Sequence, residues 1–239
     1  MIDIYSFSSQ GGREYNEDKV GFAYTPYGAV LVAADGLGGH RGGAEASGIV
    51  VDTILAEPLD DNKNDKDWLK KRLEAADQEI LDQQAVQANK MKSTVVALKI
   101  SGTKATWAHA GDSRLYYIHN SRIEAVTEDH SVAFKKYRAG EISRAEIATD
   151  EDQSSLLRSL GSQSKLKLDF GETTEPLTAG DGFLLCSDGF WEYLQDQEIL
   201  FDFLKTNSAQ AWTELLMLRV IARLQSDSDN LSVVTAMIR

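Results

Sequence analysis

Four aspartates stand where apolar strand-like segments end or begin, and carboxylates at such positions can bind metal ions. Asp35 lies in VLVAADGLGG, Asp112 in TWAHAGDSR, Asp188 in FLLCSDGF and Asp229 in SDSDNLSVV. One Asp-Gly after a strand often forms only a turn, because Gly adopts positive φ and Asp bonds its own backbone. Four such sites favour a metal site, since strand ends can meet at one sheet edge and converging carboxylates repel each other unless a cation lies between them.

The type of ligand favours a hard cation. Oxygen-only ligands select Mg²⁺ or Mn²⁺ over zinc. The histidines, at positions 40, 109, 119 and 130, never have the i, i+4 spacing of a zinc-binding helix. We expect His109 and His119 to be packed or surface residues in strands. Cys186, between FLL and SDG, is expected to be a buried strand cysteine.

A charged segment near the N-terminus could add a phosphate ligand. Residues 11–18 read GGREYNED. In this turn-prone stretch Arg13 offers a planar fork to a phosphate, and Glu17 or Asp18 could support a metal through water. The alternative interpretation is a solvated charged loop.

The elements that would position these residues are short strands and a few helices. Closely spaced strand candidates in the middle of the chain are typical of hairpins and antiparallel sheet. Strand candidates are 2–5, 19–25, 29–34, 94–100, 105–110, 114–119, 122–126, 165–170, 182–186 and 231–238. Helix candidates are 44–56, 68–88, 131–139, 196–205 and 209–224. Strict strand–helix alternation is absent from this pattern, which indicates the α+β class.

Composition narrows the class of protein further. The 239 residues, with only three prolines and no linker-like tract, favour a single domain spanning 1–239. Lys and Arg number 25 against 37 Asp and Glu, a net charge of −12 that argues against binding nucleic acid through the overall field. A single cysteine, an N-terminus unlike a signal peptide and no long apolar run lead us to expect a cytoplasmic protein without a membrane partner.

Seven motifs occur in a characteristic order along nearly the whole chain. They are R-x-x-N-E-D at 13–18, DGLGGHRGG at 35–43, GDSRLY at 111–116, T-x-D-H-S at 127–131, LLRSLG at 156–161, SDGFWEYL at 187–194 and DN at 229–230. This order resembles the signature of the metal-dependent protein phosphatases, the protein phosphatase 2C family. The DG-x-GG-H form and the short chain resemble its bacterial branch.

The resemblance implies a fold and a metal centre. The implied fold has two packed antiparallel sheets flanked by helices, with a flap segment at about 131–162 beside the site. Asp35 would bridge two metal ions, and the Gly36 carbonyl would help to bind one of them. Asp188 and Asp229 would bind the first ion.

The resemblance also assigns the surrounding residues. Glu17 would serve the second ion largely through water, with Asp18 in the outer shell. Asp112 would contribute to a third, weaker ion, and Arg13 would bind the substrate phosphate.

The implied activity is hydrolysis of phosphoserine and phosphothreonine in proteins. Two to three Mn²⁺ or Mg²⁺ ions would neutralise the phosphate, and a metal-bridging water would attack phosphorus in line without a phosphoenzyme. The expected partner is a phosphorylated protein substrate, with the enzyme acting as a monomer that opposes a Ser/Thr kinase.

One position departs from the family pattern. Eukaryotic members carry a histidine directly after the metal-binding Asp-Gly, proposed as the general acid, whereas Leu37 stands here and cannot donate a proton. His40 follows in a glycine-rich turn, and its direction cannot be read from the sequence. A metal-bound water is therefore favoured as the acid.

Other functions remain as alternatives. A non-catalytic phosphatase-like binding module would normally lose metal carboxylates, which this chain retains. A partner-switching phosphatase with one regulatory substrate cannot be separated from the main interpretation by sequence. A Ca²⁺-binding domain lacks its twelve-residue loop, and Gly36–Arg41 is not a G-x-G-x-x-G motif.

Overall fold

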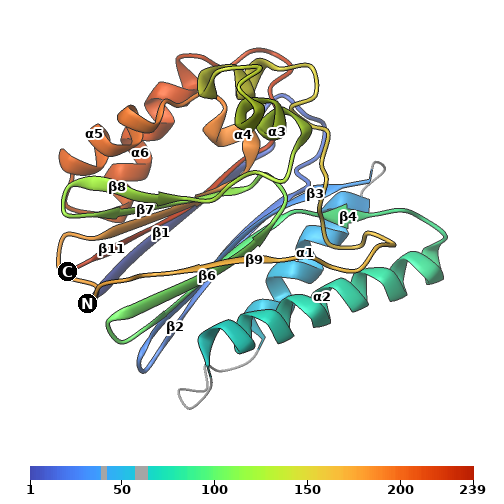
Figure 1. Ribbon diagram of the computed structural model, residues 1–239, viewed down its shortest axis with the longest axis horizontal. Coiled ribbons are helices and arrows are strands. Elements are labelled where there is room, and N and C mark those ends of the chain that lie inside the picture. The colour runs from blue at the N-terminus through green and yellow to red at the C-terminus, as the bar shows by residue number, and fades with distance from the viewer. Residues whose placement is uncertain (39–41, 57–63) are drawn as a thin grey trace.

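The computed structural model describes residues 1–38, 42–56 and 64–239. Two antiparallel sheets pack face to face, and helices cover the outer face of each, as Figure 1 shows. The strand order is β1-β11-β10-β7-β8 in one sheet and β2-β3-β5-β6-β9 in the other, where β4 also pairs with β3. This arrangement confirms the expected α+β sandwich.

The elements have the following bounds. The strands are β1 (Ile2–Ser9), β2 (Asp18–Thr25), β3 (Gly28–Leu37), β4 (Lys92–Ser93), β5 (Val95–Ser101), β6 (Lys104–Ala110), β7 (Arg114–His119), β8 (Arg122–Val126), β9 (Asp169–Glu172), β10 (Gly182–Cys186) and β11 (Leu231–Ile238). The helices are α1 (Gly42–Leu55), α2 (Asp65–Gln87), α3 (Val132–Ala139), the 3₁₀ helix η1 (Arg144–Thr149), α4 (Asp188–Trp191), α5 (Asp196–Leu204) and α6 (Ala209–Ile221).

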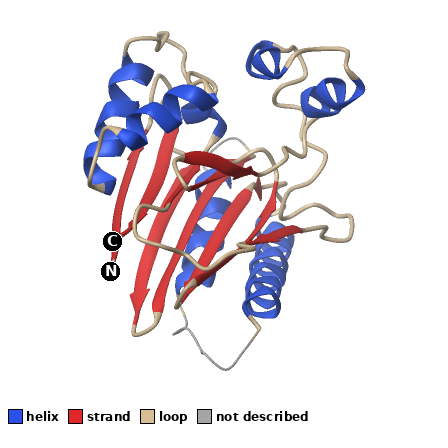
Figure 2. Cartoon of the chain, turned by 60° about the vertical axis from the view of Figure 1, so that its left-hand side comes forward, coloured by secondary structure: helices blue, strands red, loops and turns tan. Residues whose placement is uncertain are grey.

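The apolar run of β3 explains how the layers are held together. Side chains of a strand point alternately to its two faces. Leu31 and Ala33 face the core between the sheets, whereas Val30 and Val32 belong to the core beneath α1 and α2. Both faces of β3 are therefore buried, and the strand reads as a continuous apolar segment. A third core lies beneath α5 and α6 on the other sheet, so that helices cover both outer sides in Figure 2.

Helix ends follow local sequence signals. Ser131 caps α3, accepting a hydrogen bond from Phe134 N at 3.2 Å, and Gly140 ends the helix with a φ of +78°. Asn64 caps α2 by accepting from Lys66 N at 3.0 Å. These side chains satisfy backbone N–H groups that have no partner within the helix. Ser143 and Glu146 form a capping box at the start of the 3₁₀ helix η1.

One predicted strand is displaced. The sequence predicts a strand at 165–170, but β9 covers Asp169–Glu172 and pairs with β6 from His109 to Thr106. The alternating residues Leu166, Leu168 and Phe170 all pack against the core beneath α2. Their spacing therefore reflects burial on one side, whereas the hydrogen-bonded ladder begins only at Asp169.

The two ends of the chain lie together, as Figure 1 shows. β1 pairs with β11 from Ile2 opposite Ile238, and the Met1 ammonium donates to the Arg239 carbonyl at 2.7 Å.

In the described part of the chain, no helix has the length and apolar character needed to cross a membrane. The single-domain assignment and the flap at 131–162 remain predictions.

Candidate active site

Three of the predicted aspartates meet where the two sheets come together. Asp35 lies near the end of β3, Asp112 in the turn from β6 to β7, and Asp188 begins α4 directly after β10. One carboxylate oxygen from each lies within 4.8 Å of the others. Segments from both sheets thus bring their carboxylates to one place, as the strand-end pattern predicts.

Burial makes ionisation of these carboxyl groups unfavourable when no cation is bound. Burial, followed by the charge of Asp188, raises the pKa values of Asp35 and Asp112 well above their ordinary range. Burial also raises the pKa of the neighbouring Asp18 to about 7. Like charges in a desolvated site disfavour ionisation, and a divalent cation reverses that effect.

Two buried carboxylate oxygens point to the same conclusion. Within the residues that the structure describes, Asp112 Oδ1 and Glu17 Oε1 are buried and have no hydrogen-bond partner. A buried acceptor left unpaired costs about 1–3 kcal/mol. Hard oxygen donors with free lone pairs fit Mn²⁺ or Mg²⁺, so the residues present suit such an ion.

The backbone around Asp35 is held by Ser93, at the end of β4, and by Thr94, which follows it. Asp35 N donates to Thr94 Oγ1 at 2.9 Å, and Thr94 N donates to Asp35 O at 2.8 Å. Ser93 Oγ donates to the same carbonyl at 3.0 Å. Thr94 Oγ1 also lies 2.7 Å from Ser113 Oγ, which joins this strand end to the turn that carries Asp112.

Asp188 is held by its own helix and by the segment at 131–162. Asp188 Oδ1 accepts from Gly189 N at 2.7 Å, and Oδ2 accepts from Gln153 Nε2 at 3.2 Å. Trp191, in the same short helix, donates from Nε1 to the Asp112 carbonyl at 2.9 Å. The α4 turn thus positions two of the three clustered aspartates.

Two glycines bring the Glu17 segment close to β3. Gly36 N donates to the Glu17 carbonyl at 3.1 Å, and a Cβ on Gly36 would lie 2.0 Å from the Gly43 carbonyl oxygen. A Cβ on Gly43 would lie 2.8 Å from the Glu17 carboxyl carbon. Only residues without a side chain permit these approaches. Asp18 accepts from Ser187 Oγ at 2.7 Å.

Arg13 and Asp229 form an ion pair at the rim of the cluster. Arg13 Nη2 lies 2.9 Å from Asp229 Oδ2, and the two side chains are 56% and 42% exposed. The Asn230 side chain connects this rim to the N-terminal loop: its Oδ1 accepts from Glu17 N at 2.7 Å, and its Nδ2 donates to Tyr15 O at 2.9 Å. Arg13 is therefore accessible to a ligand while it remains beside the carboxylates.

The predicted residues fall into an inner and an outer group. Asp35, Asp112 and Asp188 form the inner cluster, while Asp229 and Glu17 lie outside that group of three. Their roles as metal ligands remain predictions. Leu37 ends β3 opposite Lys92 and carries no proton donor, and His40 lies outside the described residues.

Some positioning residues were not assigned from sequence. Asn230 stands in the DN motif, so its position beside Asp229 was a usable signal. Ser187 likewise begins the SDGFWEYL motif, whereas Thr94 and Gln153 have no local pattern that separates them from ordinary polar residues. Their contacts with Asp35, Asp18 and Asp188 arise only from tertiary packing.

Comparison with known proteins places this chain in a family. The family model for protein phosphatase 2C matches residues 8–217. A serine/threonine phosphatase stp from Listeria welshimeri is 31% identical over 203 residues, which cover 81% of this chain and 79% of that protein.

Solved structures agree with the sequence comparison. The Mycobacterium tuberculosis serine/threonine phosphatase PstP/Ppp is 27% identical, with a TM-score of 0.86 over 100% of this chain and 99% of that one. The PstP catalytic domain in complex with two manganese ions is 28% identical, with a TM-score of 0.79 over 99% of this chain and 97% of that one. With the family model, the ordered motifs and the buried carboxylate cluster in agreement, this chain belongs to the protein phosphatase 2C family.

Proposed function

We propose that this metal-dependent protein serine/threonine phosphatase hydrolyses phosphoserine and phosphothreonine by direct attack of water held at the carboxylate cluster. The observation that carries the proposal is the meeting of Asp35, Asp112 and Asp188 with a buried oxygen of Asp112 left unpaired. A structural cluster would satisfy its oxygens with protein donors. An open set of hard ligands instead suits catalytic ions.

The residues that would hold the ions follow the sequence prediction. Their common feature is a carboxylate or carbonyl oxygen at the shared edge of the sheets, namely Asp35, Gly36, Asp112, Asp188, Asp229 and Glu17, with Asp18 behind them. When bound, such ions neutralise the phosphate dianion and acidify the attacking water. The protein supplies a rigid arrangement of oxygens, because Thr94 fixes Asp35 and Gly189 fixes Asp188.

Three further residues, Arg13, Cys186 and Leu37, bear on the chemistry that the chain can perform. Arg13 presents its guanidinium at the rim, where it can bind and orient a phosphate oxygen. Cys186 cannot act as a nucleophile, because it is fully buried and burial raises its pKa. Leu37 leaves no side-chain acid after Asp-Gly, so we infer that water protonates the leaving alkoxide.

The proposed function also includes a cellular role for the enzyme. A phosphatase of this family acts on phosphoprotein, and we propose that the enzyme opposes a Ser/Thr kinase in cytoplasmic signalling. The monomeric state remains a prediction. The expected lack of a nucleic-acid partner rests on the acidic composition, and the expected lack of a membrane partner rests on the absence of a long apolar run.

The first experiment is hydrolysis of a phosphothreonine peptide by chelator-treated protein. We expect no turnover without metal and a rise to saturation as Mn²⁺ is added, because the clustered carboxylates need the cation both to stay ionised and to bind phosphate. Phosphate release is the measurement. Folded protein that remains inactive at every Mn²⁺ and Mg²⁺ concentration would instead support the non-catalytic binding module.

Arg13→Ala should chiefly weaken substrate binding. Loss of one charge-assisted contact to phosphate is expected to raise KM about tenfold or more, because a hydrogen bond to a charged group contributes roughly 1.5–3 kcal/mol. Arg122→Ala is a matched control, because Arg122 is also exposed and paired with a carboxylate, Glu124 at 3.3 Å. If both variants keep the wild-type KM and kcat, Arg13 has no role in the site.

A further inference from the structure

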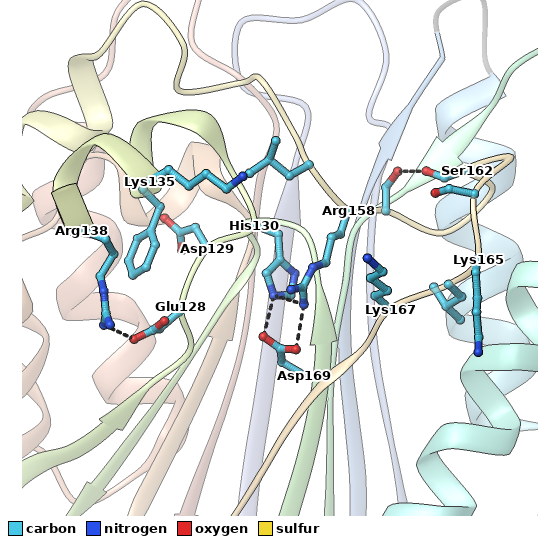
Figure 3. Close-up of a pocket in the computed structure, with 15 residues that line it drawn as sticks. Glu128, Asp129, His130, Lys135, Arg138, Arg158, Ser162, Lys165, Lys167 and Asp169 are labelled. Carbon is cyan, nitrogen blue, oxygen red and sulfur yellow. Dashed lines mark hydrogen bonds and ion pairs between the residues drawn. The ribbon is translucent and has the colours of Figure 1, made fainter.

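A pocket opens between α3 and the segment at 157–169. It has a volume of about 670 Å³, with α3 on one side and residues 157–169 on the other, as Figure 3 shows. Five cationic residues line it: Lys135, Arg138, Arg158, Lys165 and Lys167. The acidic residues that line it are Glu128, Asp129 and Asp169. The pocket thus has an excess of positive charge in a chain whose net charge is −12.

The acidic residues of this pocket are already neutralised by arginines. The pairs are Glu128 with Arg138, Asp169 with Arg158, and Asp129 with the buried Arg114, each at 2.7 Å. Across the described ranges of the chain, Lys135, Lys165 and Lys167 make no ion pair, and all three are exposed. The lysines are therefore the charges left to attract a ligand.

The two walls present lysines from opposite sides. In Figure 3, Lys135 extends from α3 toward the centre of the pocket, and Lys167 extends from the other wall. Between them, Arg158 contacts both His130 Nε2 at 3.1 Å and Asp169 Oδ1 at 2.7 Å. An internal network therefore holds the floor in place, while the two lysines remain unpaired above it.

The pocket is joined directly to the catalytic edge. His130, on its floor, donates from its backbone N to the Gly111 carbonyl at 2.9 Å, and its Nδ1 accepts from Gly111 N at 3.2 Å. Gly111 immediately precedes Asp112 of the carboxylate cluster. A peptide whose phosphorylated residue occupies the cluster would pass this pocket with its neighbouring residues.

We infer that this pocket binds an acidic segment of the phosphoprotein substrate, next to the phosphorylated residue. The inference rests on the proposed function. Aspartate and glutamate side chains match the unpaired lysines, and Leu157, 45% exposed on the rim, offers an apolar contact to the same segment. A long polyanion such as nucleic acid fits less well, because the acidic remainder of the surface would repel it.

Peptide kinetics with a charge-reversed enzyme tests the inference. The substrates are phosphothreonine peptides with glutamates on the N-terminal side, on the C-terminal side, or replaced by glutamine. We expect wild-type enzyme to prefer one acidic peptide about fivefold to tenfold in kcat/KM, as two exposed charge contacts allow. Lys135→Glu with Lys167→Glu should abolish the preference and leave hydrolysis of p-nitrophenyl phosphate unchanged. Added salt should also reduce the preference.

A matched control is Lys71→Glu with Lys104→Glu, which makes the same change of charge at exposed sites away from the pocket. The inference is overturned if wild-type enzyme shows no preference, if the pocket variant keeps it, or if the control loses it equally. A second measurement does not depend on catalysis: the fluorescence anisotropy of a labelled, unphosphorylated acidic peptide reports its binding to the enzyme. Binding that depends on Lys135 and Lys167 in an enzyme without phosphatase activity would contradict the proposed function but support this pocket.

Discussion

Asp35→Asn should lose nearly all phosphatase activity while the protein stays folded. The substitution keeps the shape of the side chain but removes the charge at the centre of the carboxylate cluster. We expect kcat to fall by about 10³-fold or more, which corresponds to roughly 4 kcal/mol of transition-state stabilisation. Phosphate release from a phosphothreonine peptide at saturating Mn²⁺ is the measurement. Asp188→Asn should give a similar loss, because its oxygen lies in the same cluster.

The same variant should be more stable than wild type when metal is absent. Burial and the charges of Asp188, Asp18 and Asp112 raise the pKa of Asp35, so an ionised carboxylate there destabilises the metal-free fold. We therefore expect a higher melting temperature for metal-free Asp35→Asn than for metal-free wild type. The control is Asp52→Asn, at an exposed position on α1. It should change neither the turnover nor the melting temperature of the metal-free protein. Near-normal turnover of Asp35→Asn would refute the assignment of this residue as a metal ligand.

Removing metal should abolish activity and lower the stability of the wild-type enzyme. A cation that binds only the folded state stabilises it by about 2.7 kcal/mol when its concentration is 100 times Kd. We expect the chelated protein to melt at a lower temperature than the Mn²⁺-loaded protein at neutral pH. Equal melting temperatures in chelator and in saturating Mn²⁺ would argue against binding at the buried carboxylates.

The difference in stability should depend on pH with a definite sign. Asp35, Asp112 and Asp18 have raised pKa values in the metal-free fold, about 7 for Asp18. The stability that these protonated carboxyls contribute is present below the unfolded pKa, about 3.9, and is lost as the pH rises through the folded values. Metal should offset this loss near pH 7. Asp181 raises the pKa of His119, so the stability that His119 contributes also falls as the pH rises. This contribution is the same with and without metal, and it does not change the difference between the two.

The layers of the fold could be predicted because their signals are local. The apolar run 29–34 becomes a strand buried on both faces, and the hairpin-rich centre becomes antiparallel sheet. The helix expected at 131–139 is α3, which Ser131 caps and Gly140 ends. The strand at 165–170 was displaced, because one-sided burial and strand pairing have the same alternating pattern.

The residues that form and support the site could be predicted only in part from the sequence. The motifs predicted which carboxylates carry the chemistry, and the structure brings one oxygen each of Asp35, Asp112 and Asp188 within 4.8 Å of the others. The support from Gln153 was not assigned, because a polar residue in a loop has no pattern that reveals its partner. The pairing of Arg13 with Asp229 likewise depends on how β11 lies beside the N-terminal loop.

The sequence alone established the candidate ligands and their order along the chain, and it predicted most of the elements that carry them. These properties depend on residue identity and on conformations set within a few positions. The tertiary structure alone established which oxygens meet, which of them remain unpaired, and where unpaired lysines gather around a pocket. Those properties depend on strand register and on the packing of two sheets, which place residues distant in the chain within a few ångströms of each other.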